Sequence, residues 1–185
     1  MPGLVGRGFL RRRYARRPAR LDGDGRLVPL EAQDRGLWRR ELIDEGIAIL
    51  TEVLPRPPTG PYQLQAAIAA VHDEAELAQD TDWRQILGLY DLLERLDPSP
   101  MARLGRVVAL AMVAGPRAGL TACEELAGEL GDHHRWFAVR AHLLQDAGEA
   151  RAAVRAFREA ARRTASLPER DYLTRRADRL SAEQK

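Results

Sequence analysis

The sequence predicts an all-α protein of about eight antiparallel helices, stacked as helical hairpins. Three observations support this prediction. Aromatic residues make up 5% of the 185 residues while alanine, leucine, arginine and glutamate dominate, a composition typical of helical proteins. Apolar residues recur at helical spacing in segments that proline or glycine separates. The break at 114–118 returns at 147–151, and this 33-residue period is close to that of tetratricopeptide repeats.

The first predicted elements are a connector and two helices. The connector, DGDGRLVPL at 22–30, has a glycine pair that suits a tight turn and a short extended piece before Pro29. A broad apolar stripe predicts a helix over roughly 33–54, which ends at the prolines of 55–58. The next helix begins at Pro61, because the first turn of a helix tolerates a residue without an N–H.

Two further helices follow in the middle of the chain. Thr81 or Asp82 is expected to cap a helix that carries Trp83 and ends at the Asp-Pro-Ser-Pro sequence of 97–100. A fourth helix covers 101–114 and ends before a Gly-Pro pair. The spacing of apolar residues therefore places four helices before residue 115.

Four helices are predicted after residue 115. The fifth ends before Gly131, and Asp132 is expected to cap the sixth, which ends at 147–148. The seventh follows at once, and the last covers the exposed apolar end of the array. Small residues that let paired helices approach, and the bulky residues that fill the next groove, recur in two copies: Val108, Ala111, Gly115, Gly119 and Cys123, then Ala141, Leu144, Gly148, Ala153, Phe157 and Ala160. This pattern predicts about three stacked hairpins in a right-handed, tetratricopeptide-like array.

The charge distribution separates a basic arm, residues 1–20, from a single helical domain over 21–185. The arm holds seven of the 29 basic residues and none of the 27 acids, so the remainder has 22 basic residues and a net charge of −5. The arm would contact nucleic acid or a membrane surface, or else it is a disordered tail or lies on its own acidic body. The candidate residues for nucleic-acid contact are Arg11, Arg12, Arg13, Arg16, Arg17 and Arg20.

No pattern typical of an enzyme or of a metal or cofactor site stands out in this sequence. The Asp-Gly-Asp-Gly segment at 22–25 lacks the further oxygen ligand of a calcium loop, and neither His72 with Glu76 nor 132–134 has an evident third ligand. The three serines fit helix ends, where capping explains them. The lone Cys123 is expected to be buried, in a reducing cytoplasm, and the apolar run 107–113 is too short to span a membrane.

A set of polar and aromatic residues around the first three helices has two possible roles. Gln65 and His72 share one helix face with Ala69, and Trp83 stands at a neighbouring helix start. This face either lines a groove for a partner peptide or forms a buried polar joint, because helical repeats bind peptides and buried polar groups need partners. The candidate residues are Gln33, Asp34, Arg35, Trp38, Tyr62, Gln65, His72, Asp82 and Trp83.

Several long motifs resemble the C-terminal extension of bacterial extracytoplasmic-function sigma factors. The segments that carry the resemblance are ARRPAR at 15–20, LVPLEAQDRGLW at 27–38, GPYQLQAAIAAVH at 60–72 and DTDW at 80–83. The resemblance covers about residues 15–183. The promoter-reading and polymerase-binding regions of that family are absent from this sequence, and 3–13 do not match the helix that leads in from them.

The resemblance implies a non-catalytic domain that regulates transcription initiation. Its expected partners are the sigma-factor core regions or RNA polymerase, in a bacterial cytoplasm, with no cofactor. A nucleic-acid-contacting protein that uses the arginine-rich arm and a ligand-sensing helical domain remain as alternatives. The resemblance does not identify the partner or the regulating signal.

Overall fold

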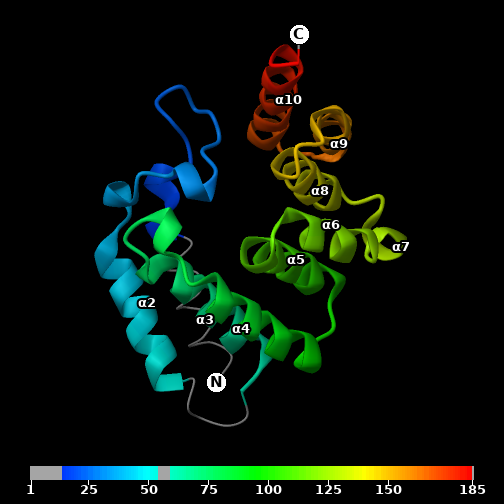
Figure 1. The fold of residues 1–185 in the computed structure, drawn as a ribbon. Coiled ribbons are helices and arrows are strands. Elements are labelled where there is room, and N and C mark those ends of the chain that lie inside the picture. Colours follow the sequence, from blue (N-terminus) through cyan, green and yellow to red (C-terminus); the bar gives the residue numbers. More distant parts are fainter. Residues whose placement is uncertain (1–13, 54–58, 185) are drawn as a thin grey trace. The chain divides into compact units, whose positions relative to one another are not determined.

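The computed structural model describes residues 14–53 and 59–184, and these residues form nine α-helices joined by short turns (Figure 1). The all-α prediction is confirmed. The described residues divide into two compact units, one formed by residues up to Asp24 with Val28–Pro98, and the other by Gly25–Leu27 with the residues from Ser99 onwards. The single domain that sequence analysis expected over 21–185 stays a prediction.

The first unit places one helix between two others. Its elements are η1 (Arg17–Ala19), η2 (Leu30–Ala32), η3 (Arg35–Leu37), α2 (Arg40–Val53), α3 (Pro61–Glu74), η4 (Ala78–Asp80) and α4 (Trp83–Leu96), where η marks a 3-10 turn. Helix α3 contacts both α2 and α4 (Figure 1). It is therefore buried on several faces, through Leu64, Ala66, Ala67, Ile68, Ala70, Val71 and Asp73.

Local capping explains where these helices begin. Pro61 stands in the first turn of α3, and the amide of Gly60 donates to Oε1 of Gln63 at 2.5 Å. Asp82 caps α4 as predicted, by accepting from the Gln85 amide at 2.9 Å. The predicted helix over 33–54 begins later, at Arg40, because 30–37 form two 3-10 turns instead.

Residues 14–20 belong to the first unit and do not form a free arm. Ala15 is 0% exposed and Ala19 is 4% exposed, and both pack in one cluster with Trp38 and Ile43. The Arg39 amide also donates to the carbonyl of Ala15 at 3.1 Å. Residues 14–20 therefore lie on the body of the protein, which is one of the alternatives given for the basic arm, whereas residues 1–13 lie outside the described part of the chain.

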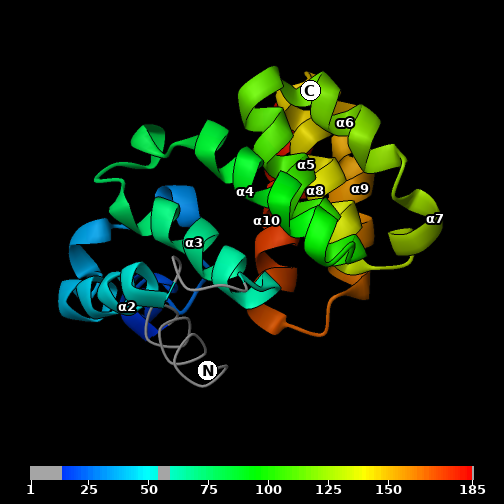
Figure 2. The same ribbon diagram turned by 90° about the horizontal axis from the view of Figure 1, so that it is seen from below.

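The second unit is a run of helices in which sequence neighbours pack together. Its elements are α5 (Pro100–Ala114), α6 (Pro116–Glu124), α7 (Ala127–Leu130), α8 (His134–Asp146), α9 (Ala150–Arg163) and α10 (Leu167–Ala182). Contacts join α5 to α6, α6 to α8, α8 to α9 and α9 to α10, and Figure 2 shows α5, α6, α8 and α9 adjacent to one another. The short α7, which sequence analysis merged with the fifth helix, accounts for the ninth described helix.

One predicted cap in this unit is wrong. His133, and not Asp132, caps α8, because its Nδ1 accepts from the Arg135 amide at 3.2 Å. The breaks themselves are confirmed at Gly115 and Gly148, whose φ angles of +92° and +80° suit glycine.

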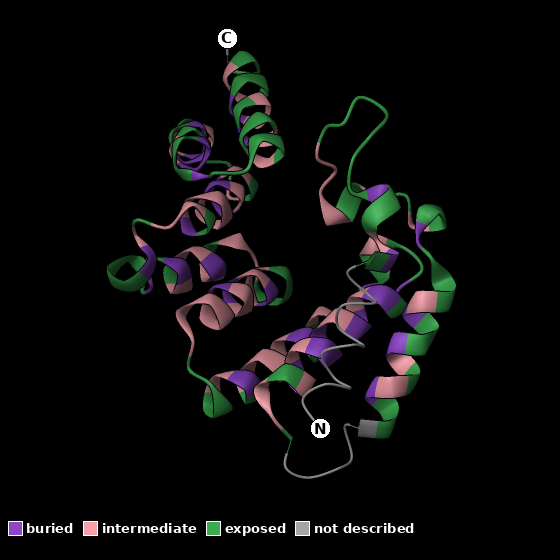
Figure 3. Ribbon diagram, turned by 180° about the vertical axis from the view of Figure 1, so that it is seen from behind, coloured by how far each residue is buried: buried purple, intermediate pink, exposed green. Residues whose placement is uncertain are grey.

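The repeat pattern predicted from small and bulky residues is visible in the packing of the second unit. Phe157 is 0% exposed, in a core that also holds Ala141, Leu144, Ala153 and Ala160. The buried positions of α8 and α9 are coloured purple in Figure 3. These helices thus pack through the residues that the repeat comparison singled out.

The earlier copy of the repeat shows why a small residue is needed there. A Cβ atom at Gly119 would lie 2.6 Å from the Cβ of Ala111 and 3.1 Å from Leu143, so α5, α6 and α8 meet closely at this glycine. Cys123 is fully buried as expected, and burial raises the pKa of its thiol to about 12. The indole of Trp136 donates to the Cys123 carbonyl at 2.8 Å.

In the part of the chain that the structure describes, no helix is both long enough and apolar enough to cross a membrane.

Candidate functional site

A buried carboxylate stands near the C-terminal end of α3. The side chain of Asp73 is 0% exposed, and the guanidinium of Arg16 donates through Nε to its Oδ1 at 2.6 Å. The Nη2 of Arg16 pairs with the same oxygen and also donates to the carbonyl of Ala69 at 3.3 Å. A buried carboxylate is strongly unfavourable unless it is paired, so this ion pair ties the N-terminal segment to α3.

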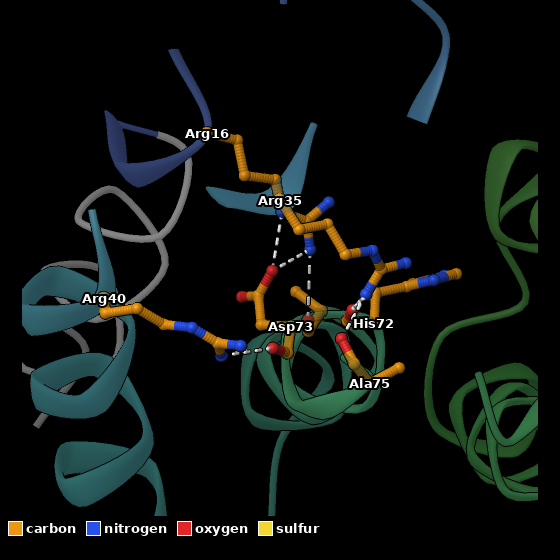
Figure 4. A network of polar contacts seen from close by, with 7 residues as sticks. Arg16, Arg35, Arg40, His72, Asp73 and Ala75 are labelled. Atoms are coloured by element: carbon orange, nitrogen blue, oxygen red, sulfur yellow. Dashed lines mark hydrogen bonds and ion pairs between the residues drawn. The ribbon is translucent and has the colours of Figure 1, made fainter. Parts of the chain in front are cut away.

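Two more arginines reach the last carbonyls of the same helix. Arg35 donates through Nη1 to the carbonyls of His72 at 2.8 Å and Ala75 at 2.5 Å. Arg40, in the first turn of α2, lies 3.4 Å from the carbonyl of Asp73. Carbonyls at a helix end lack intrahelical partners and carry the negative end of the helix dipole, so cations are favourable there. We call Arg16, Arg35 and Arg40 the arginine cluster, and Figure 4 shows it around α3.

Trp38 makes cation–π contacts with two members of the arginine cluster. Its side chain is 4% exposed, and the guanidiniums of Arg16 and Arg35 lie 5.0 and 4.8 Å from its ring centroid. A cation over an indole face is attracted by the ring quadrupole. Burial and the nearby charge of Arg16 lower the pKa of Arg35, and the charge of Asp73 opposes this shift. The cluster thus brings together α3, η3 and the segment before η1.

His72 precedes Asp73 on the same helical turn, and its ring contacts the first residue of α4. Its ring meets Trp83 edge-on, with centroids 5.1 Å apart and an interplanar angle of 80°. Burial, with the charges of Arg16 and Arg35, lowers the pKa of His72 to about 4. The lowered pKa favours the neutral imidazole near pH 7, in the form that packs against the Trp83 ring.

The lowered pKa of His72 predicts a pH-dependent stability. Because the folded pKa of about 4 lies below the ordinary 6.5, the unfolded chain binds more protons between these values. The contribution of neutral His72 is complete above pH 6.5 and is lost as the pH falls toward 4. In denaturant titrations at pH 7 and pH 4.5, we expect His72→Phe to reduce the acid-induced loss of unfolding free energy by about 2 kcal/mol. Equal losses in both proteins would contradict this assignment.

Four of the candidate polar residues lie together in the first unit. Arg35, Trp38, His72 and Trp83 form a continuous set of contacts through the end of α3. Gln33 extends the set toward the connector, because its Nε2 donates to the Val28 carbonyl at 3.1 Å. These contacts favour the polar joint over the groove for these residues.

The other candidates have local roles or lie apart. Asp34 caps η3 by accepting from the Gly36 amide at 2.8 Å, and Asp82 caps α4. Tyr62, in the first turn of α3, is 72% exposed, and Gln65 is half-buried. A partner-binding role therefore stays a prediction for the exposed Tyr62 and for Gln65, which follows it on the next turn.

The six arginines proposed for nucleic-acid contact do not share one environment. Arg16 is engaged by Asp73, whereas Arg17 and Arg20 are exposed to solvent. Arg11, Arg12 and Arg13 lie outside the described residues. Contact with nucleic acid stays a prediction for the exposed pair and for the three arginines outside the described part.

Sequence analysis missed Asp73 and Arg40. Asp73 follows Ala66 and Ala70 on one helix face, at spacings of four and three residues, where the stripe is otherwise apolar. An acid in an apolar stripe indicates a buried charge that needs a cation. No comparable signal marks Arg40, which resembles any polar residue at the start of a helix.

An acidic pocket of about 340 Å³ lies between the end of α3 and the start of α4. Its lining consists of Val71, Glu74, Ala75, Glu76, Asp80, Asp82 and Gln85. Within the described ranges, no three histidine, cysteine or acidic side chains are grouped to hold a metal ion.

Comparison with known proteins gives one family match and one relative. Residues 8–54 match the family described as "Family of unknown function (DUF6596)". Over 183 residues, the chain is 40% identical to a protein of Rhizobium meliloti (strain 1021) whose name calls it uncharacterized. The match covers 99% of this chain and 43% of the relative, so the chain spans less than half of that protein. No solved structure matches this chain.

Proposed function

We propose that this chain is a non-catalytic, protein-binding domain that regulates a sigma factor at transcription initiation. The proposal rests on the motifs at 15–20, 27–38, 60–72 and 80–83, which resemble the C-terminal extension of those factors. Several of these motif residues make the contacts that hold the first unit together, among them Arg16, Arg35 and Trp38. The resemblance therefore falls on residues with a physical role in the fold.

The relative supports a role within a larger protein. More than half of the Rhizobium meliloti protein lies outside the match, so a segment like this chain is there joined to other sequence. A domain that acts on attached or separate sigma regions needs a binding surface and not a catalytic group. Paired helices provide such surfaces in many helical-repeat proteins.

The observation that carries the proposal furthest is the exposure of Tyr62. Large aromatic side chains are enriched at protein interfaces, and this one is 72% exposed on a motif that resembles the sigma-factor extension. The residues beside it in the sequence motif are packed inside, as Leu64 and Ile68 are. Tyr62 is thus the motif residue best placed to contact a partner.

The test mixes the chain with sigma-factor promoter-binding regions and, separately, with core RNA polymerase. Association is measured by calorimetry and light scattering. We expect binding to at least one of them, weakened about 10-fold or more by Tyr62→Ala. Leu167→Ala, which removes a 64% exposed side chain from the second unit, is the control and should leave affinity unchanged. The absence of binding to either partner would overturn the proposal, and equal effects of the two substitutions would exclude Tyr62 as the contact.

A further inference from the structure

The second unit has a groove between its last two helices whose charged lining is entirely basic. The groove has a volume of about 510 Å³ and is lined by Arg158, Ala161, Arg162, Arg170 and Thr174. Residues 158, 161 and 162 share one face of α9, and 170 and 174 share one face of α10. Among the described residues, guanidiniums thus stand on both walls and no carboxylate lines the groove.

The surroundings of the groove reinforce its positive charge. Residues 150–182, which span α9 and α10, contain nine arginines and four acids, a net charge of +5 within a chain of net charge +2. Arg170 also lies in the first turn of α10, where the helix dipole is positive. The local electrostatic field therefore favours the binding of an anion in this groove.

The ion pairs made by the lining arginines leave them able to bind a further anion. Arg158 lies 3.9 Å from Asp178, and both side chains are more than half exposed, so this pair is weak. Arg162 pairs with Glu159 on its own helix, and Arg170 donates to the carbonyl of Thr164 at 3.0 Å. Because a guanidinium has five N–H donors, these contacts use part of its capacity.

The shape of the donor set distinguishes phosphate from carboxylate. A carboxylate presents two oxygens in one plane and accepts one forked arginine well. A phosphate group carries up to two charges and has oxygens pointing in several directions, so it suits cations that approach from two walls. Ala161 has a small side chain and adds no bulk to the groove. The Thr174 hydroxyl donates to the Arg170 carbonyl. The guanidiniums are therefore the groups that would bind the anion.

We propose that the groove between α9 and α10 binds a phosphate group through Arg158, Arg162 and Arg170. The phosphate belongs either to a small phosphorylated ligand or to a nucleic-acid backbone. The site lies in the second unit and does not depend on the sigma-factor proposal, whose candidate contact is Tyr62 in the first unit.

The experiment uses the full chain and two probes, sodium pyrophosphate in calorimetry and a fluorescein-labelled single-stranded DNA in anisotropy. The groove variant is Arg158→Gln with Arg162→Gln. The matched control is Arg151→Gln with Arg155→Gln, which removes the same charge from exposed positions of the same helix outside the groove. Thermal unfolding followed by circular dichroism checks that both variants fold as the parent does.

We expect pyrophosphate affinity to fall about 10-fold or more in the groove variant and less than about 2-fold in the control. Groove-dependent binding of pyrophosphate without DNA binding would identify a small phosphorylated ligand. DNA binding whose salt dependence weakens by roughly two counterions in the groove variant alone would identify a nucleic-acid backbone. The proposal is overturned if the parent binds neither probe or if both variants lose affinity equally. It is also overturned if poly-glutamate binds as tightly as pyrophosphate.

Discussion

Asp73→Ala is expected to lower the free energy of unfolding by about 3–5 kcal/mol, since it removes one partner of a buried ion pair. The substitution leaves the guanidinium of Arg16, whose side chain is 18% exposed, without its carboxylate. Arg35 and Arg40 then stand near an uncompensated positive charge at the end of α3. The N-terminal segment and η3 should therefore detach more easily from this helix.

Urea denaturation measures this effect, with Glu74→Ala as the control. Glu74 is the next residue on the helix and is exposed, so its removal should change stability by less than about 0.5 kcal/mol. A double variant, Arg16→Met with Asp73→Leu, should recover much of the loss, because two apolar side chains can replace a buried ion pair. A cost for Asp73→Ala that equals the cost of the control would show that the pair contributes nothing to stability.

Phe157→Ala is expected to destabilise the second unit by about 3–5 kcal/mol, because it opens a cavity in a closed core. The ring is 0% exposed and meets His142 edge-on, with centroids 5.0 Å apart. Ala153 and Ala160 flank it on the same helix, and their short side chains leave little that could move into the space. Phe157→Leu should cost less, since it keeps part of the buried volume.

Hydrogen exchange followed by mass spectrometry shows which helices lose amide protection in the Phe157→Ala variant. Leu167→Ala, at a 64% exposed position of the same unit, should leave exchange almost unchanged. Faster exchange in 99–182 with α3 unaffected would show that the two units open separately. Faster exchange throughout both units would show the single cooperative domain that the sequence analysis expected over 21–185. Unchanged protection in α9 itself would contradict the role assigned to Phe157.

Much of the helical architecture was predictable because its causes are local. Pro61 and Asp82 mark helix starts through the chemistry of a first turn, and Gly148 marks a break through its positive φ. The cap of α8 was predicted one residue too early, since Asp132 and His133 both offer an acceptor and only backbone geometry selects one. Local propensity likewise could not separate the turns of 30–37 from the helix that follows them.

The candidate site was predicted only in part, because some of its contacts join residues that are far apart in the chain. Arg35, Trp38, His72 and Trp83 were named from sequence motifs, and the structure brings them together at the end of α3. Asp73 was not predicted, because its partner Arg16 lies 57 residues earlier in the chain. Sequence analysis placed Arg16 in the basic arm without identifying its contact, and the structure pairs it with the buried Asp73.

The sequence by itself determined the all-α class, most helix boundaries and the close packing of α8 and α9, because periodicity, caps and small residues act over a few turns. The tertiary structure decided which charges are internal. The free energy of a charge depends on its burial and its partners, and these are set by contacts between segments distant in the chain. That is why the arginine cluster around the end of α3 and the basic groove between α9 and α10 form only when the helices are packed.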